Sequence, residues 1–220
     1  MNNKLLLLGG GGHCTSIIDT LLQLQSYSEI GIVEKQGTET ASILSVPVVG
    51  EDKDLQSLFA HGYTHAFVSL GSIGNVVVRK NLFNTSITIG FIIPNIIDAS
   101  AQVSPHTQLC SGIFVGKRVV INAGTIVGDC AILNTSATID HHCSIGAFSH
   151  ISPGAVLCGD VHVGKNTHIG AHSVIRQNVS IGNDVVIGMG SVVLHDIPDG
   201  VIAYGNPCKV IKKRELSHNC

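Results

Sequence analysis

The chain has 220 residues, only 13% of them charged, and a formal net charge of −2, which excludes the basic surface that a nucleic-acid-binding protein needs. Its apolar runs, such as LLLL at residues 5–8, are far shorter than the roughly 20 residues that cross a bilayer, so we expect no membrane insertion. The 7 cysteines form no CxxC pair, which indicates reduced thiols in a cytoplasmic protein.

Residues 4–93 alternate between strand-like and helix-like patterns. The apolar run at 4–10 predicts a buried strand, and apolar residues at helical spacing predict a helix over 15–25. Further strands are predicted at 29–34, 65–71 and 87–93, and further helices around 52–62 and 75–83. This alternation predicts a small parallel α/β sheet in a Rossmann-like domain over residues 1–94.

Residues 95–220 follow a different rule, a six-residue repeat. From Ile97 to Val193 every sixth residue is aliphatic. From Ala101 to Ser191, the residue two positions before each aliphatic one is small or β-branched. Both face the same way on a strand, so the pattern predicts a parallel β-helix of hexapeptide repeats with three sides to each coil. Glycine often follows the aliphatic residue, where we expect it to supply a permissive backbone for a corner.

Several motifs together resemble one known family. The repeats, LLLLGGGGHC at 5–14, GIVEKQ at 31–36 and IPDGVIAYGNPCK at 197–209 resemble the left-handed β-helix acyltransferases. The segment 132–155 narrows the resemblance to the sialic acid O-acetyltransferase type and its relatives that N-acetylate UDP-4-amino sugars. The resemblance implies a left-handed coil, acetyl-CoA as cosubstrate, and a homotrimer with active sites between subunits.

The segment ATIDHHCSIG at 137–146 is placed by the repeat. Ala137 and Cys143 take interior positions, whereas Asp140, His141 and His142 lie at or beside a corner and face outward or towards a neighbouring subunit. Because the thiol then points away from both imidazoles, we expect no metal site formed by Cys143 and the two histidines.

The family resemblance implies that His141 is the general base, which takes a proton from a sugar amine or hydroxyl attacking acetyl-CoA. The N-acetyltransferases that this chain most resembles have an acidic residue directly after that histidine, where His142 stands here. Asp140, His142 and Asn134 therefore remain candidates for orienting the base.

Three further positions are assigned to acetyl-CoA by the resemblance: His150, Ala171 and Met189. Ala171 and Met189 are 18 residues apart, one full coil, so the repeat predicts that they stack. The family contacts the cosubstrate there mostly through main-chain groups.

The run GGGGHC, between a predicted strand and helix, is typical of a phosphate-binding turn. As a dinucleotide fingerprint it is imperfect, because the third glycine position falls on Cys14 or Thr15. The resemblance implies instead a nucleotide-sugar site. Its residues are Gly11, Gly12, His13, Glu34, Lys35 and Gly71.

The sequence thus predicts an acetyl-CoA-dependent enzyme that N-acetylates a nucleotide-activated amino sugar for a surface glycan or glycoprotein. O-acetylation of sialic acid is the nearest alternative. A zinc-dependent hydratase resembling the γ-carbonic anhydrases and a non-catalytic solenoid are more remote. The identity of the nucleotide, UDP, CMP or GDP, stays open.

Overall fold

The computed structural model describes residues 3–35, 37–38, 41–73 and 75–215, which form two compact units. One unit comprises Met1–Gly71 and Val77–Ala99, and the other comprises Ser72–Val76 and Ser100–Cys220. The division falls at Ala99, a few residues beyond the boundary at residue 94 that the change of sequence pattern predicted. A short segment after Gly71 groups with the coil.

A five-stranded sheet in the order β3-β4-β2-β1-β5 organises the first unit. Its strands are β1 (Lys4–Leu8), β2 (Glu29–Glu34), β3 (Ser42–Ile43), β4 (Val46–Glu51) and β5 (Tyr63–Val68). All neighbours are parallel except β3 and β4, a short hairpin that the sequence pattern did not indicate. The four leucines of β1 are fully buried, as expected of a central parallel strand covered on both faces.

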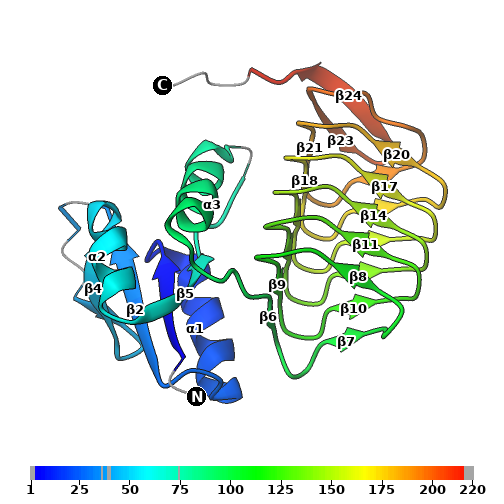
Figure 1. Ribbon diagram of the computed structural model, residues 1–220. Coiled ribbons are helices and arrows are strands. Elements are labelled where there is room, and N and C mark those ends of the chain that lie inside the picture. The colour runs from blue at the N-terminus through cyan, green and yellow to red at the C-terminus, as the bar shows by residue number, and fades with distance from the viewer. Residues whose placement is uncertain (1–2, 36, 39–40, 74, 216–220) are drawn as a thin grey trace. The chain divides into compact units, whose positions relative to one another are not determined.

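The helices cover both faces of this sheet. They are α1 (Gly12–Leu24), α2 (Leu55–Ala60), which follows the 3-10 turn η1 (Asp52–Asp54), and α3 (Val77–Ile89). From β1 the chain crosses to β2 through α1, and from β4 it crosses in the opposite direction to β5 through α2. Because crossovers between parallel strands are right-handed, α1 and α2 lie on opposite faces, as Figure 1 shows.

The strand predicted at 87–93 is wrong. Its first residues continue helix α3 to Ile89, and Gly90 then ends the helix with φ of +106°. Only Ile92 contacts the sheet as a strand would, through an isolated parallel bridge to His65. The β-branched run favours a strand locally, but helix propensities differ by only about 0.7 kcal/mol per residue, so packing decides. A short strand, β6 (Ile96–Ile97), follows.

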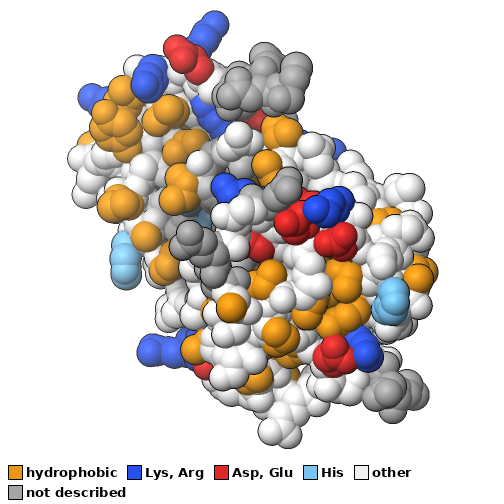
Figure 2. All heavy atoms as spheres, turned by 90° about the vertical axis from the view of Figure 1, so that its left-hand side faces the viewer, with side chains coloured by type: hydrophobic (Ala, Val, Ile, Leu, Met, Phe, Trp, Pro, Cys, Tyr) orange, Lys and Arg blue, Asp and Glu red, His pale blue; other side chains and the backbone are white. Residues whose placement is uncertain are grey.

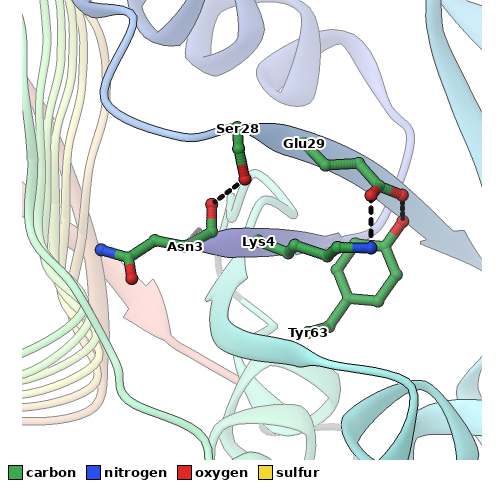
Figure 3. Close-up of polar contacts among 5 residues, drawn as sticks. All are labelled: Asn3, Lys4, Ser28, Glu29 and Tyr63. Atoms are coloured by element: carbon green, nitrogen blue, oxygen red, sulfur yellow. Dashed lines mark hydrogen bonds and ion pairs between the residues drawn. The ribbon is translucent and has the colours of Figure 1, made fainter. Parts of the chain in front are cut away.

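Polar side chains join the amino ends of three strands of this sheet. The Lys4 ammonium lies 2.6 Å from the Glu29 carboxylate, which also accepts a 2.6 Å hydrogen bond from the Tyr63 hydroxyl. The Ser28 hydroxyl donates to the main-chain carbonyl of Asn3 at 3.1 Å, beside this cluster (Figure 3). These contacts tie β1, β2 and β5 together at the end remote from the glycine turn.

The second unit is built from three stacks of strands, which have two residues each except for the last two, β23 and β24. One stack contains β7 (Gln102–Val103), β10 (Val120–Ile121), β13 (Thr138–Ile139), β16 (Val156–Leu157), β19 (Val174–Ile175) and β22 (Val192–Val193). Another contains β8 (Gln108–Leu109), β11 (Ile126–Val127), β14 (Ser144–Ile145), β17 (His162–Val163) and β20 (Ser180–Ile181). The last contains β9 (Phe114–Val115), β12 (Ile132–Leu133), β15 (His150–Ile151), β18 (His168–Ile169), β21 (Val186–Ile187), β23 (Val201–Gly205) and the antiparallel β24 (Cys208–Lys213). Paired residues of strands β7 to β22 are 18 residues apart, as Ile121 and Ile139 are, which confirms the three-sided coil.

The interior of the coil follows the predicted register. Every sixth residue from Ile121 to Val193 is at most 3% exposed. Small hydroxyl residues also point inward, and each finds a main-chain acceptor. The hydroxyl of Thr125 donates to the carbonyl of Asp140 at 2.9 Å, and that of Ser149 to Gly164 at 2.7 Å. The narrow core is therefore both apolar and satisfied in hydrogen bonds.

The expected role of glycine at the corners is wrong. The glycines that follow the interior aliphatic residues do not have positive φ. That conformation occurs two residues later, at positions such as Phe148 (φ +60°) after Gly146 and Asn166 (φ +57°) after Gly164. At Gly146, a Cβ atom would lie 2.5 Å from the carbonyl carbon of Gly164 in the next coil. These glycines therefore permit close stacking of successive coils rather than an unusual backbone conformation.

None of the described helices is long and apolar enough to cross a membrane. On the face drawn in Figure 2, acidic and basic side chains are sparse and lie among apolar and uncharged ones. No broad basic field is visible there, in keeping with the charge balance of the sequence.

Candidate functional site

The corner between β13 and β14 carries Asp140, His141 and His142, as the register predicts. Main-chain hydrogen bonds hold it to the coils on both sides. The N–H of Asp140 donates to the carbonyl of Leu157 at 2.9 Å, and that of His142 to the carbonyl of Ala123 at 3.0 Å. Both imidazoles are exposed on this fixed backbone.

The two histidines face one another through the same ring atom. Their Nδ1 atoms lie 3.1 Å apart, and the rings meet edge to face at 78°. One nitrogen must carry the hydrogen while the other offers its lone pair, so the two rings hold complementary tautomers. His142, at the position where the family resemblance implies an acid, is thus the residue that reaches the His141 ring.

The Asp140 carboxylate does not serve that purpose here. One of its oxygens accepts the main-chain N–H of His141 and the side-chain amide of Asn122, both at 2.8 Å. The bond from Asn122 and then that from the His141 N–H lower the pKa of this carboxyl below its usual value. The Asp140 carboxylate therefore holds the backbone of the corner as an anion. The His141 imidazole is contacted by His142 and not by Asp140.

Two glycines make room for the imidazoles, and sequence reasoning missed both. A Cβ at Gly159 would lie 2.4 Å from a ring carbon of His141, and a Cβ at Gly124 would lie 2.4 Å from a ring carbon of His142. Each glycine lies in the neighbouring coil, 18 residues from the histidine that it faces. The 18-residue spacing to each histidine could have identified these glycines, whereas the sequence around each glycine does not.

His150 lies in a second, more buried cluster on β15. Its Nδ1 is 2.8 Å from the carbonyl of Ser72, so this nitrogen carries the hydrogen and donates it. Its Nε2 then accepts a 3.2 Å hydrogen bond from the side-chain amide of Asn134. The His168 ring packs edge to face on it with centroids 5.0 Å apart, and burial lowers the pKa of His168. Asn134 thus orients His150, whereas the sequence analysis considered it as a residue that orients His141.

Ala171 and Met189 occupy stacked corners one coil apart. The N–H of Gly190 donates to the carbonyl of Ala171 at 2.8 Å. The Met189 side chain is 81% exposed, and a Cβ at Gly170 would lie 2.5 Å from the Met189 nitrogen. The predicted stacking is confirmed, and the corners present mainly backbone and one exposed thioether.

The glycine turn lies at the carboxyl ends of the parallel strands of the first unit. Gly11 caps helix α1 and Gly12 begins it, and neither would bring a Cβ within 4 Å of another group. The Glu34 carboxylate accepts the N–H of Gly10 at 2.6 Å and that of Lys35 at 3.1 Å. An open helix N-terminus beside a fixed acid suits a ligand that has both phosphates and hydroxyls.

The other predicted residues of this turn lie close by. A Cβ at Gly71 would stand 3.4 Å from the Cβ of His13, so these two residues adjoin. Cys14, at the third position of the imperfect fingerprint, is fully buried, and burial raises the pKa of its thiol to about 11. Cys14 is therefore a packing residue between α1 and the sheet.

Comparison with known proteins agrees with this architecture. Residues 4–86 match the PglD N-terminal domain family, residues 142–177 the bacterial transferase hexapeptide (six repeats) family, and residues 160–195 the hexapeptide repeat of succinyl-transferase. WeeI from Acinetobacter baumannii, at 20% identity and a TM-score of 0.77, shares the fold.

Two solved structures are more similar. The acetyltransferase domain of PglB from Neisseria gonorrhoeae, in complex with acetyl coenzyme A, is 34% identical over 96% of this chain and 100% of that one, with a TM-score of 0.89. PerB from Caulobacter crescentus, in complex with CoA and GDP-perosamine, is 36% identical over 96% of this chain and 99% of that one, with a TM-score of 0.88. The chain therefore belongs to the family of left-handed β-helix sugar acetyltransferases with a PglD-type N-terminal domain.

Proposed function

We propose that this enzyme transfers the acetyl group of acetyl-CoA to the amine of a nucleotide-activated 4-amino sugar. The observation that carries the proposal is the fixed pair of imidazoles at the β13–β14 corner, 3.1 Å apart through Nδ1. The PglB domain is solved with acetyl coenzyme A, and PerB with CoA and GDP-perosamine. Similarity over nearly the whole length of both relatives supports the same chemistry here.

The geometry supports a simple division of labour between the two histidines. The Nδ1–H of His141 donates to the Nδ1 lone pair of His142, which leaves the Nε2 lone pair of His141 available. The sugar nitrogen attacks the thioester carbonyl carbon while Nε2 takes its proton. The carbon–sulfur bond then breaks, CoA leaves as the thiolate, and the proton passes from His141 to restore neutral imidazole and CoA thiol.

A neutral imidazole stabilises the charged form of His141 less than a carboxylate would. His142 therefore positions the base with less electrostatic support than the acid of the relatives provides. A histidine has been probed in the perosamine N-acetyltransferase of Caulobacter crescentus, which is solved with one histidine replaced by asparagine or by alanine, bound to CoA and GDP-perosamine. That work supports a histidine at the centre of the reaction in the family.

The remaining predicted residues have places consistent with two substrates. We assign acetyl-CoA to His150, whose ring tautomer is fixed, and to the stacked corners at Ala171 and Met189. The nucleotide sugar is assigned to the glycine turn. Its contacts there would be Gly11, Gly12, His13, Glu34, Lys35 and Gly71. As family members do, the enzyme would act as a homotrimer with sites between subunits, in the cytoplasm, on a precursor of a surface glycan or glycoprotein.

The acceptor is tested by measuring CoA release from acetyl-CoA with three compounds in parallel: a UDP-4-amino-4,6-dideoxy sugar, GDP-perosamine and sialic acid. Turnover with either nucleotide amino sugar supports the proposal and identifies the nucleotide. Turnover with sialic acid alone would instead establish the O-acetyltransferase. Silence with all three would contradict both.

A further inference from the structure

A third ligating side chain lies beside the two histidines. Asp160 occupies the corner one coil further on, between β16 and β17, and its main-chain N–H donates to the carbonyl of His141 at 3.0 Å. One ring nitrogen of His141, one of His142 and one carboxylate oxygen of Asp160 all lie within 4.8 Å of one another. The set is two imidazoles and one carboxylate, all on a rigid backbone.

The distance between the Nδ1 atoms of His141 and His142 is close to the distance between two imidazole nitrogens bound to one zinc ion. Zinc binds imidazole nitrogen at about 2.0–2.1 Å in a tetrahedral arrangement, which places two such nitrogens about 3.3 Å apart. The two Nδ1 atoms are 3.1 Å apart. A metal ion would take the place of the single shared hydrogen between the two rings. Rotation of the Asp160 side chain, whose carboxylate oxygen lies within 4.8 Å of both ring nitrogens, would supply a third ligand and leave the fourth position open.

We propose that His141, His142 and Asp160 form a binding site for a divalent first-row metal ion of the zinc type, and that this ion inhibits the enzyme. The donor set of imidazole and carboxylate suits such ions. The sequence excluded a metal here only through Cys143, and the structure agrees on that residue: its thiol is buried and donates to the carbonyl of Cys158 at 3.2 Å. Asp160 supplies the anionic ligand instead.

Inhibition follows from the tautomers and rests on the proposed role of His141. A neutral imidazole has one N–H hydrogen, so a metal ion bound to Nδ1 leaves that hydrogen on Nε2. Nε2 can then no longer accept a proton from the sugar amine. The ion therefore opposes the reaction that the same ring would catalyse.

The test measures binding of Zn²⁺ to the untagged, chelator-treated full chain by isothermal titration calorimetry. Cobalt substitution provides a second readout in the visible spectrum. Asp160→Asn removes one ligand and keeps the side-chain shape at a left-handed corner that asparagine tolerates. Asp184→Asn is the matched control, because Asp184 has the same corner conformation (φ +57°) outside the cluster.

We expect one zinc per chain, an affinity at least about 10-fold weaker in Asp160→Asn, and an unchanged affinity in Asp184→Asn. Loss of binding in His142→Ala, with the folded state verified by circular dichroism, would support the same ligands. Equal affinity in Asp160→Asn and Asp184→Asn, or no zinc bound by the wild type, would overturn the site.

Activity separates this inference from the proposed function. In the wild type, zinc should inhibit CoA release at the concentration at which it binds, and Asp160→Asn should need at least about 10-fold more zinc for the same inhibition. Full activity in the zinc-saturated wild type would overturn the inhibitory role. If no acceptor gives turnover, the proposed function fails, while calorimetry still decides whether the metal site exists.

Discussion

Asn134, directly after strand β12, and His150, in the paired strand β15, are joined by a 3.2 Å hydrogen bond between the side-chain amide and Nε2. The carbonyl of Ser72 holds the opposite ring nitrogen at 2.8 Å. Both nitrogens of the imidazole are therefore occupied, and its orientation and tautomer are fixed. Such a ring suits binding rather than proton transfer, because no lone pair remains to accept a proton.

Replacing Asn134 tests that assignment. In Asn134→Ala, the Nε2 of His150 loses its donor, and a lost hydrogen bond typically costs about 1 kcal/mol. We expect KM for acetyl-CoA to rise about 5-fold, with kcat and the KM of the sugar nearly unchanged. Initial-rate kinetics with each substrate varied in turn provide the measurement. A rise confined to the KM of the sugar would contradict the assignment of His150 to acetyl-CoA.

Replacing His142 tests its action on His141. In His142→Glu, a carboxylate facing Nδ1 of His141 stabilises the protonated ring, so we expect the acidic limb of the pH–rate profile to move to higher pH. In His142→Ala the acceptor is lost, and we expect kcat to fall roughly 10-fold, less than removal of the base itself. Profiles of kcat against pH for the three proteins decide the matter. Identical profiles would show that His142 does not act on His141.

The stacking of the coils gives a prediction about stability. Gly146→Ala places a methyl group 2.5 Å from the carbonyl carbon of Gly164, and overpacking of this kind costs about 1–3 kcal/mol. Gly116→Ala is the graded comparison, because the nearest atoms there are 3.2 Å away. Urea unfolding should show a clearly larger loss for Gly146→Ala. Equal losses at both positions would argue against steric stacking as the reason for these glycines.

The polar cluster at the amino end of the first sheet predicts a pH dependence of stability (Figure 3). Contacts first with Lys4 and then with Tyr63 lower the pKa of Glu29 below its ordinary value of 4.5. A group with a lowered pKa in the folded state stabilises the protein above its ordinary pKa, and this contribution disappears as pH falls through the folded pKa. Glu29 is largely exposed, so the effect is modest.

Glu29→Gln checks this behaviour. We expect the variant to be less stable than the wild type in urea at pH 7, and the difference to shrink as pH falls below about 4.5. Tyr63→Phe, which removes the neutral donor, should cost about 1 kcal/mol at pH 7. A difference between Glu29→Gln and wild type that grew on acidification would contradict the sign of the shift.

The repeat made the coil predictable from sequence, because a six-residue period fixes which side chains point inward regardless of their neighbours. Ala137, Ile139 and Cys143 are buried as that register requires. The strand at 87–93 failed because the β-branched Ile87, Thr88 and Ile89 gave a local preference that the packing of helix α3 overrides.

The sequence predicted which residues lie at the site, but it did not predict which of their side chains contact one another. The corner position of His141 follows from the period, whereas the Nδ1–Nδ1 contact with His142 depends on side-chain torsions that no repeat specifies. The same holds for Asp160, which is distant in sequence and adjacent in space because one coil separates it from the histidines. Gly124 and Gly159 were missed because their importance lies in what the neighbouring coil places over them.

The most direct test of the account compares CoA release by the wild type and His141→Ala, with saturating acetyl-CoA and the best nucleotide amino sugar. Because a positioned general base typically contributes about 10²–10⁴-fold, kcat should fall by that factor while the circular dichroism spectrum and acetyl-CoA affinity stay unchanged. Turnover that survived in His141→Ala within a few-fold of wild type would contradict the assignment of the base.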